Sequence, residues 1–330
     1  MKYKVGIISA ISLLSIGLLA PQPSLATTTT CSNAFPGATI LQTSQPTNIG
    51  KQFGGTNASE GVWSSTKFVI HGQTAIKTTR VQFSAGRYAT MVWLDPNLVS
   101  FSQIPGTTSP IDKFGTGKIP DSLRPCYLAA FTGAYLMKDS QGGAIYNGVQ
   151  TTPVKDPKTK KVVNTGAMVD GKATLVTYSD GTLDVVAWPN INHSKTLSSA
   201  RQNLPLIVQN GVSQVPVNEP HNSWGWVWQG TGVHTNDVYR SGIGVRADGT
   251  IVWVLGAKLN ATGLANLLIR GGAVRAMALD MNKGFANGVF YGPYHTAKVV
   301  GIPINPDAPT RVTRFWNTNI RDFVAVFARP

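Results

Sequence analysis

Apolar and polar residues alternate along several short segments after residue 66, with the period of two that is typical of β-strands. Residues 80–94 show this alternation most clearly, residues 68–70 form a short apolar run, and residues 126–135 are almost entirely apolar. A further apolar run predicts the last strand over residues 323–327. Short strands are therefore expected to make up most of the fold.

Two pairs of predicted strands are each joined by a turn that contains the dipeptide Asp-Gly. Asp-Gly between two runs rich in β-branched residues is a strong hairpin signal, because the turn requires residues that tolerate positive φ. The strands predicted in this way cover residues 172–178 and 182–188 in the first hairpin, and residues 239–246 and 250–255 in the second.

One segment predicts an amphipathic helix, followed by a buried strand. Asn260 or Thr262 can cap its N-terminus, and Gly271 with the glycine after it ends the helix. Residues 273–279 then form an apolar run that ends at Asp280. The apolar stripe of the helix consists of Leu264, Leu267 and Leu268.

Strands predominate, and no regular β-α-β alternation or fixed-period repeat is present. This pattern predicts the α+β class, with a mostly antiparallel or mixed β-sheet, few helices and a single core. We divide the chain into a signal peptide over 1–26, a loosely structured N-terminal segment over 27–66, and one domain over 67–330. The second of these is rich in Thr, Ser, Gly and Asn.

The N-terminus has the three parts of a secretory signal peptide. Lys2 and Lys4 precede an uncharged, mostly apolar run over 5–20, and Ser24 and Ala26 put small residues at the −3 and −1 positions. A membrane anchor is the alternative, but a spanning helix needs about 20 apolar residues and this run is shorter. We expect cleavage after Ala26, no stable membrane insertion afterwards, and a secreted or cell-envelope exterior location.

The charge balance favours an anionic partner. The chain has a formal net charge of +14, which falls to +12 when a signal with two lysines and no acid is removed. Outside the cytoplasm such a charge suits a glycan or a sugar-phosphate polymer. Nucleic acid is not expected, because the sequence has no recognised binding module and its basic residues are scattered except over 155–161.

The chain has only two cysteines, Cys31 and Cys126. In an oxidising compartment they can pair, and closing so long a loop stabilises a fold by up to about 4.7 kcal/mol in the chain-entropy model. Two buried free thiols are the alternative. So few cysteines exclude a zinc site made by cysteine ligands alone.

Several catalytic motifs are missing, which narrows the chemistry. The sequence contains no Gly-x-Ser-x-Gly elbow, no His-Glu-x-x-His, no P-loop and no dinucleotide fingerprint. The sequence indicates no cofactor with certainty. It leaves open whether a divalent cation binds.

Four segments carry polar residues at the ends of apolar runs, and in this order they resemble the phosphodiester glycosidase family. That family includes the domain of the mannose-6-phosphate uncovering enzyme and its bacterial relatives. Thr132 and Ala134 depart from the family pattern, which usually has Asn and Gly there. The resemblance rests on 130–135 with 142–148, on Arg-Gln-Asn-Leu-Pro at 201–205, on Arg-Ser-Gly-Ile-Gly at 240–244, and on Leu-Asp-Met-Asn at 279–282, the last of which is similar to a bacterial branch.

The resemblance implies a secreted glycosidase that hydrolyses a sugar-1-phosphodiester or a related extracellular or cell-envelope polysaccharide. It implies that Asp280 is the acid/base or stabilises an oxocarbenium-like state, and that Arg240 holds the phosphate. The second acidic group is not obvious, and Glu219 and Asp237 are the nearest candidates. Substrate-binding roles are expected for Thr132, Gly133, Arg201, Gln202, Asn203, Asn210, His234, Ser241 and Asn282.

Simpler structural explanations exist for each of these residues. Asp280 can brace a turn, Arg240 can form an ordinary ion pair, and the amides after Arg201 can stabilise a turn. The alternating Trp224, Trp226 and Trp228 predict one aromatic strand face, which can stack on sugar rings but more often packs in a core. The alternative function is a non-catalytic envelope or glycan-binding protein that retains the fold.

Overall fold

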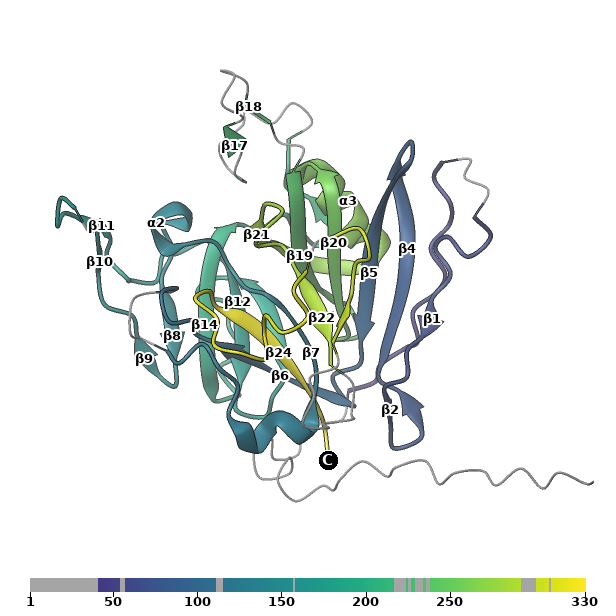
Figure 1. The fold of residues 1–330 in the computed structure, drawn as a ribbon, viewed down its shortest axis with the longest axis horizontal. Coiled ribbons are helices and arrows are strands. Elements are labelled where there is room, and N and C mark those ends of the chain that lie inside the picture. Colours follow the sequence, from purple (N-terminus) through teal and green to yellow (C-terminus); the bar gives the residue numbers. More distant parts are fainter. Residues whose placement is uncertain are drawn as a thin grey trace, which may run out of the picture.

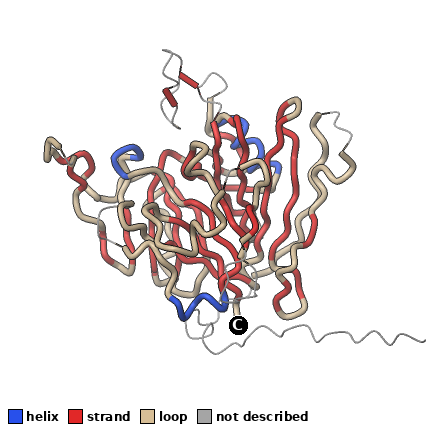
Figure 2. Tube along the Cα trace, in the orientation of Figure 1, coloured by secondary structure: helices blue, strands red, loops and turns tan. Residues whose placement is uncertain are grey.

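A computed structural model of the protein describes residues 41–53, 57–110, 115–156, 158–216, 224, 227–228, 234–235, 238–291, 301–308 and 310–330. Figures 1 and 2 show a body of strands joined by loops, with few helices. Every strand pairing among the described residues is antiparallel, as in the central pairs β4–β5, β19–β20 and β19–β21. The predicted class, mostly antiparallel β-sheet with few helices, is confirmed.

The largest sheet has eight strands in the order β1-β4-β5-β20-β19-β21-β15-β16. Its central strands are long and almost completely buried, because both faces are covered. Its strands are β1 (Ser64–Ser65), β4 (Ile76–Ser84), β5 (Arg87–Leu94), β15 (Val208–Gln209), β16 (Val212–Ser213), β19 (Val238–Arg246), β20 (Ile251–Leu259) and β21 (Ala273–Met281).

Two five-stranded sheets complete the body, in the orders β13-β12-β14-β8-β9 and β23-β22-β7-β24-β6. The first contains β8 (Ala144–Tyr146), β9 (Val149–Gln150), β12 (Lys172–Tyr178), β13 (Leu183–Ala187) and β14 (Leu197–Pro205). The second contains β6 (Val99–Ile104), β7 (Tyr127–Thr132), β22 (Gly288–Phe290), β23 (Ile302–Pro303) and β24 (Phe323–Ala328).

The remaining elements are short. Three two-stranded ribbons are formed by β2 (Val69–Ile70) with β3 (Gln73–Thr74), β10 (Val154–Lys155) with β11 (Val162–Asn164), and β17 (Val227–Trp228) with β18 (His234–Thr235). The described helices are η1 (Asp121–Cys126), α2 (Met137–Ser140) and α3 (Ala261–Arg270). None of the helices in the described ranges is long and apolar enough to cross a membrane.

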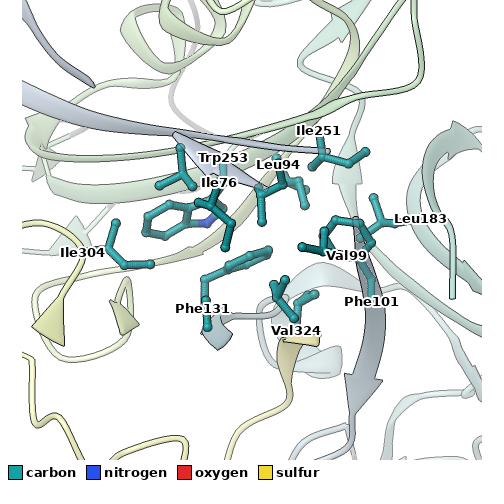
Figure 3. Close-up of a cluster of buried hydrophobic side chains, with 14 of the residues drawn as sticks. Ile76, Leu94, Val99, Phe101, Phe131, Leu183, Ile251, Trp253, Ile304 and Val324 are labelled. Carbon is teal, nitrogen blue, oxygen red and sulfur yellow. The ribbon is translucent and has the colours of Figure 1, made fainter. Parts of the chain in front are cut away.

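The main core lies between one face of the eight-stranded sheet and both five-stranded sheets. Figure 3 shows Phe131 from β7 facing Trp253 from β20, and their ring centroids are 5.3 Å apart. Phe101 and Val324 extend the same cluster through β6 and β24, and Leu183 joins it from β13. One continuous cluster therefore fixes the three sheets relative to one another.

The other face of the eight-stranded sheet is covered by α3, as the apolar stripe predicts. Asn260 caps the helix, because its side chain accepts a hydrogen bond from the N–H of Gly263 at 2.7 Å. Leu264 and Leu268 are completely buried against the sheet. Gly272 follows the helix at φ +91°, a conformation that suits glycine.

Both predicted hairpins are present. In the first, Thr177 pairs with Leu183 across a turn at Asp180 and Gly181, where the Asp180 side chain accepts from the N–H of Thr182 at 2.9 Å. In the second, Val245 pairs with Ile251. The Asp-Gly turns therefore set the register of β12 with β13 and of β19 with β20.

Two expectations for the N-terminal part concern residues outside the described ranges, namely the signal peptide and Cys31. Cys126 ends η1 and is completely buried. From residue 41 to β1 the described chain has no helix or strand. It is nevertheless anchored, because Ile49 is buried and the Trp63 Nε1–H donates to Thr47 O at 3.0 Å.

Candidate active site

The polar residues singled out by the sequence lie mostly at the ends of strands from different sheets. Figure 1 shows β7, β24, β19 and β21 running close together in the middle of the body. Backbone hydrogen bonds join their ends: Gly133, just after β7, donates to Asp322 O at 3.1 Å, and its own carbonyl accepts from Asp280 N at 2.8 Å. Gly133 therefore lies between two acidic residues that are distant in sequence.

Asp280 is a buried carboxylate with a specific cationic partner. Its residue is only 4% exposed, its Oδ1 accepts from Met281 N at 2.9 Å, and its Oδ2 accepts from Nη2 of Arg321. Burial raises the pKa of Asp280 to about 6, while the charge of Arg321 opposes that rise. A carboxyl group with a pKa near neutrality is suited to proton transfer at physiological pH. Asp280 can therefore act as an acid or a base.

A second buried carboxylate, Asp322, lies directly before β24. Its Oδ2 accepts from Nε of Arg201 at 3.0 Å and from Ala134 N at 3.4 Å, and its Oδ1 accepts from the Ser109 hydroxyl at 3.2 Å. The side chains of Asp322 and Arg201 are 3% and 1% exposed. The negative charge of Asp322 is one cause of the raised pKa of Asp280. The two carboxylates therefore act on each other electrostatically.

Gly133 is required by the close approach of Asp322. A Cβ at position 133 would lie 2.8 Å from Oδ2 of Asp322 and 3.0 Å from its backbone oxygen. The first distance is shorter than real Cβ contacts and the second is tight, so a side chain here would require the Asp322 carboxylate to shift. The glycine of this motif therefore has a packing reason, separate from any contact with substrate.

Arg240 and Ser241 begin the buried part of β19, next to the end of β21. Arg240 is 1% exposed, and its Nη1 donates to the backbone oxygen of Trp224 at 2.6 Å. The Ser241 hydroxyl donates to Asp280 O at 3.0 Å. Arg240 also lies opposite Met281 in the β19–β21 register. Both residues are therefore part of the immediate surroundings of Asp280.

Gln202 and Asn203 hold neighbouring segments in place through their side-chain amides. Gln202 Oε1 accepts from the N–H groups of Gly143 at 2.9 Å and Val169 at 2.8 Å. Asn203 Nδ2 donates to Ala278 O at 2.7 Å, which ties β14 to β21. Both residues are completely buried. Both residues lie within β14, so their side chains tie separate segments together and do not stabilise a turn, which was the structural alternative considered for them.

Thr132 and Asn282 shape the loop that follows β21. The Thr132 hydroxyl donates to Phe285 O, and it accepts from Asn287 N at 3.2 Å. Asn282 has φ +77°, and its carbonyl accepts from the N–H groups of Phe285 and Ala286, both at 3.0 Å. The loop is therefore folded back on itself and places Phe285 at the surface.

Asn210 lies apart from the other candidates. It is exposed in the turn between β15 and β16, where Gly211 N donates to Val274 O at 2.9 Å. Val274 and Asp280 are six residues apart on β21, which is about 20 Å along a strand. Asn210 lines a separate cavity of about 350 Å³ together with Asp184 and Arg275.

Some candidates fall wholly or partly outside what the structure describes. The backbone of His234 belongs to β18, but its side chain is not described, and Trp226, Glu219 and Asp237 lie outside the described ranges. Trp224 lies in a bend, and β17 begins only at Val227, so the predicted aromatic strand face does not include it. Trp224 is 5% exposed and packs in the core.

No group of three or more His, Cys, Asp or Glu side chains that could hold a metal ion occurs among the described residues. Within those ranges Asp280 and Asp322 are both paired with arginines.

Four residues near the site were not identified from the sequence, namely Asp322, Arg321, Arg314 and Phe285. Arg321 and Asp322 immediately precede the predicted strand over 323–327, so they are also polar residues at the end of an apolar run. This pattern is visible in the sequence, but it lies after the segment that resembles the phosphodiester glycosidase family.

Comparison with known proteins supports that resemblance. The sequence model of the phosphodiester glycosidase family matches residues 127–280. No curated protein matches the chain. Two similar solved structures have low identity and TM-scores. The zebrafish N-acetylglucosamine-1-phosphodiester alpha-N-acetylglucosaminidase catalytic domain, auto-inhibited by its pro-peptide, is 16% identical over 80% of this chain and 86% of its own, with a TM-score of 0.45. A hypothetical protein from Synechocystis is 14% identical over 79% and 63%, with a TM-score of 0.41.

The matched segment begins with β7 and ends at Asp280, and it contains Thr132, Gly133, Arg201, Arg240 and Ser241. Asp322 and Arg321, which complete the two buried ion pairs, lie after it in the sequence. Over residues 127–280, this chain matches the phosphodiester glycosidase family.

Proposed function

We propose that this protein is a secreted glycosidase that hydrolyses a sugar-1-phosphodiester or a related cell-envelope polysaccharide. The observation that carries the proposal is the pair of buried carboxylates beside Gly133, each held by its own arginine. Asp280 lies in the family segment and has a pKa of about 6. Most glycosidases use two carboxyl groups whose different surroundings give them different pKa values.

In this proposal Asp280 acts as a base toward the attacking water, or stabilises the positive charge that develops on the sugar. A phosphate monoester is a good leaving group, because its second pKa is about 6 and it needs little protonation to depart. We assign Asp322 to the role of the second carboxylate, which the sequence did not identify. It orients Arg201 and adds negative potential near Asp280. Arg240 is assigned to the phosphate, which a guanidinium can bind with two hydrogen bonds.

The direct test is to incubate the mature protein with sugar-1-phosphodiesters and to measure the sugar that is released. Hydrolysis of any of them above the buffer rate supports the proposal. Binding of the same compounds without turnover would instead support a non-catalytic glycan-binding protein. Thr132 favours that second function, because it replaces the usual Asn and its hydroxyl is bonded to the backbone of Phe285 and Asn287.

The pH dependence distinguishes the possible roles of Asp280. Its pKa is about 6, so the carboxylate form increases as the pH rises through that value. If Asp280 acts as a base, kcat/KM should increase through about pH 6 and then level off. A profile that instead decreases above about pH 6 would contradict the base role and assign proton donation to Asp280. Initial rates between pH 4 and pH 8 give the answer.

Export is a separate prediction. Cleavage of a signal peptide after Ala26 gives a mature protein that begins at Thr27. N-terminal sequencing of the exported protein should therefore start at Thr27. Recovery of a chain that keeps Met1 in the membrane fraction would contradict cleavage.

The proposed disulfide between Cys31 and Cys126 is expected to form during export. Alkylation of the folded, exported protein without reduction should label neither cysteine, and alkylation after unfolding and reduction should label both. Unfolding without reduction is the control for burial, because Cys126 is completely buried and a free thiol there would react only once the chain unfolds. Labelling in that control would show free thiols.

A further inference from the structure

Arg314 is a cation beside the candidate active site, and no acidic partner for it occurs among the described residues. The two ion pairs Arg201–Asp322 and Arg321–Asp280 account for both buried carboxylates. Arg314 approaches the same site but forms no ion pair with any carboxylate in the described part of the chain. Burial lowers the pKa of Arg314, the nearby charge of Asp280 opposes this, and the like charge of Arg321 adds to it. The site therefore has a surplus of positive charge.

The guanidinium groups of Arg314 and Arg321 both lie against the ring of Phe285. The Arg321 guanidinium carbon lies 4.8 Å from the Phe285 ring centroid, and that of Arg314 lies 6.0 Å from it. Nη1 of Arg314 also donates to Gly284 O. Phe285 is 36% exposed, so this arrangement lies at the surface above Asp280. An aromatic ring holds guanidinium groups in defined orientations through cation–π contact.

Both arginines have hydrogen-bond donors that no described residue uses. Arg321 is only 7% exposed, and its Nε is buried without a hydrogen-bond partner among the described residues. Within the described ranges, Nη1 is also the only Arg314 nitrogen for which a hydrogen bond is found. An unused donor on a buried charged group costs free energy unless a ligand accepts from it.

We propose that Arg314 and Arg321, held by Phe285, form the subsite that receives the phosphate of the substrate. This inference rests on the proposed function, because it takes the anion to be the phosphate of a sugar-1-phosphodiester. A phosphodiester group offers two charged non-bridging oxygens, which match the donors of two guanidinium groups. Arg240, to which the family resemblance assigns the phosphate, is 1% exposed, whereas Arg314 is half-buried. The subsite therefore replaces Arg240 as the first contact of an incoming phosphate.

Binding of inorganic phosphate to the mature protein tests the subsite without requiring turnover. Calorimetry should show binding to the wild-type protein, and Arg314→Gln should weaken it about 10- to 100-fold, as expected for loss of a charge-assisted contact. The matched control is Arg311→Gln, which removes an exposed arginine three residues earlier and should leave affinity unchanged. Absence of phosphate binding to the wild type, or equal weakening in both variants, would overturn the proposal.

Kinetics separate a specific phosphate contact from a general structural effect. Arg314→Gln should raise KM for a sugar-1-phosphodiester about 10-fold or more. It should leave KM for the p-nitrophenyl glycoside of the same sugar unchanged, because that compound has no phosphate. Arg314→Lys keeps the charge without the planar fork, so it should have an intermediate effect. An equal rise in KM for both substrates would contradict the subsite.

The two levels of the proposal can fail independently. A protein that binds phosphate through Arg314 but releases no sugar keeps the subsite and loses the hydrolytic function. A protein that releases sugar with an unchanged KM in Arg314→Gln keeps the function and loses the subsite.

Discussion

Replacing Asp280 with asparagine is expected to lower the rate of sugar release about 10²- to 10⁴-fold, the usual contribution of a proton-transfer group. Asparagine has nearly the same shape as aspartate but cannot accept a proton at neutral pH. Its side-chain oxygen can still accept from Met281 N, as Oδ1 of Asp280 does in the wild type. The measurement is kcat per folded molecule on a sugar-1-phosphodiester, for the variant and the wild type.

The fold is expected to survive this replacement. Because the pKa of Asp280 in the folded protein is above its ordinary value, ionisation is harder in the folded state than in the unfolded chain. The wild type therefore loses stability as the pH rises from about 4 to about 6, and a neutral asparagine avoids that loss. Asparagine also leaves the Arg321 guanidinium without its charged partner, so the melting temperature is expected to fall while the chain still folds. A variant with a lower melting temperature at pH 7 and unchanged kcat would show that Asp280 only braces the turn, and would contradict its catalytic role.

Replacing Asp322 with alanine is expected to destabilise the protein by about 3–5 kcal/mol, because it leaves a buried guanidinium without its partner. Arg201 is 1% exposed, so water cannot replace the lost carboxylate. The Ser109 hydroxyl and Ala134 N also lose their acceptor. Urea denaturation should show a lower midpoint with an unchanged slope.

Two controls make this result interpretable. Asp121→Ala removes an exposed aspartate paired with Lys118 and should leave the midpoint nearly unchanged. The double variant Arg201→Met with Asp322→Leu replaces both charges by apolar groups, and it should recover a large part of the lost stability. If Asp322→Ala is as stable as the wild type, Asp322 and Arg201 do not form the buried pair described above.

The local elements of this fold were predictable because short-range rules decide them. An Asp-Gly turn needs only its own backbone preferences, so the hairpins at 180–181 and 248–249 were predicted with their strands. The same holds for α3, whose cap at Asn260 and glycine end depend on residues within the helix and next to it. The resemblance over 127–280 likewise rests on short motifs along the chain.

The pairing of charges was decided by the tertiary structure alone. Asp322 is 121 residues from Arg201, and Asp280 is 41 residues from Arg321, so no local pattern links the partners. Gly133 is constrained for the same reason, because the atom nearest to its missing side chain belongs to Asp322. Asn210 shows the converse, since it follows Arg201-Gln202-Asn203 closely in sequence but lies at the far end of β21.

The sequence by itself therefore determined the two Asp-Gly hairpins and helix α3, and it indicated the family segment, since each depends on neighbouring residues and their backbone preferences. It also indicated Asp280, because a carboxylate that ends an apolar strand is visible in one dimension. Only the tertiary structure decided which arginine each carboxylate contacts. Burial in that structure also raises the pKa of Asp280 to about 6. Burial and charge at that position come from three sheets packed on one core, and the spacing along the chain carries no record of them.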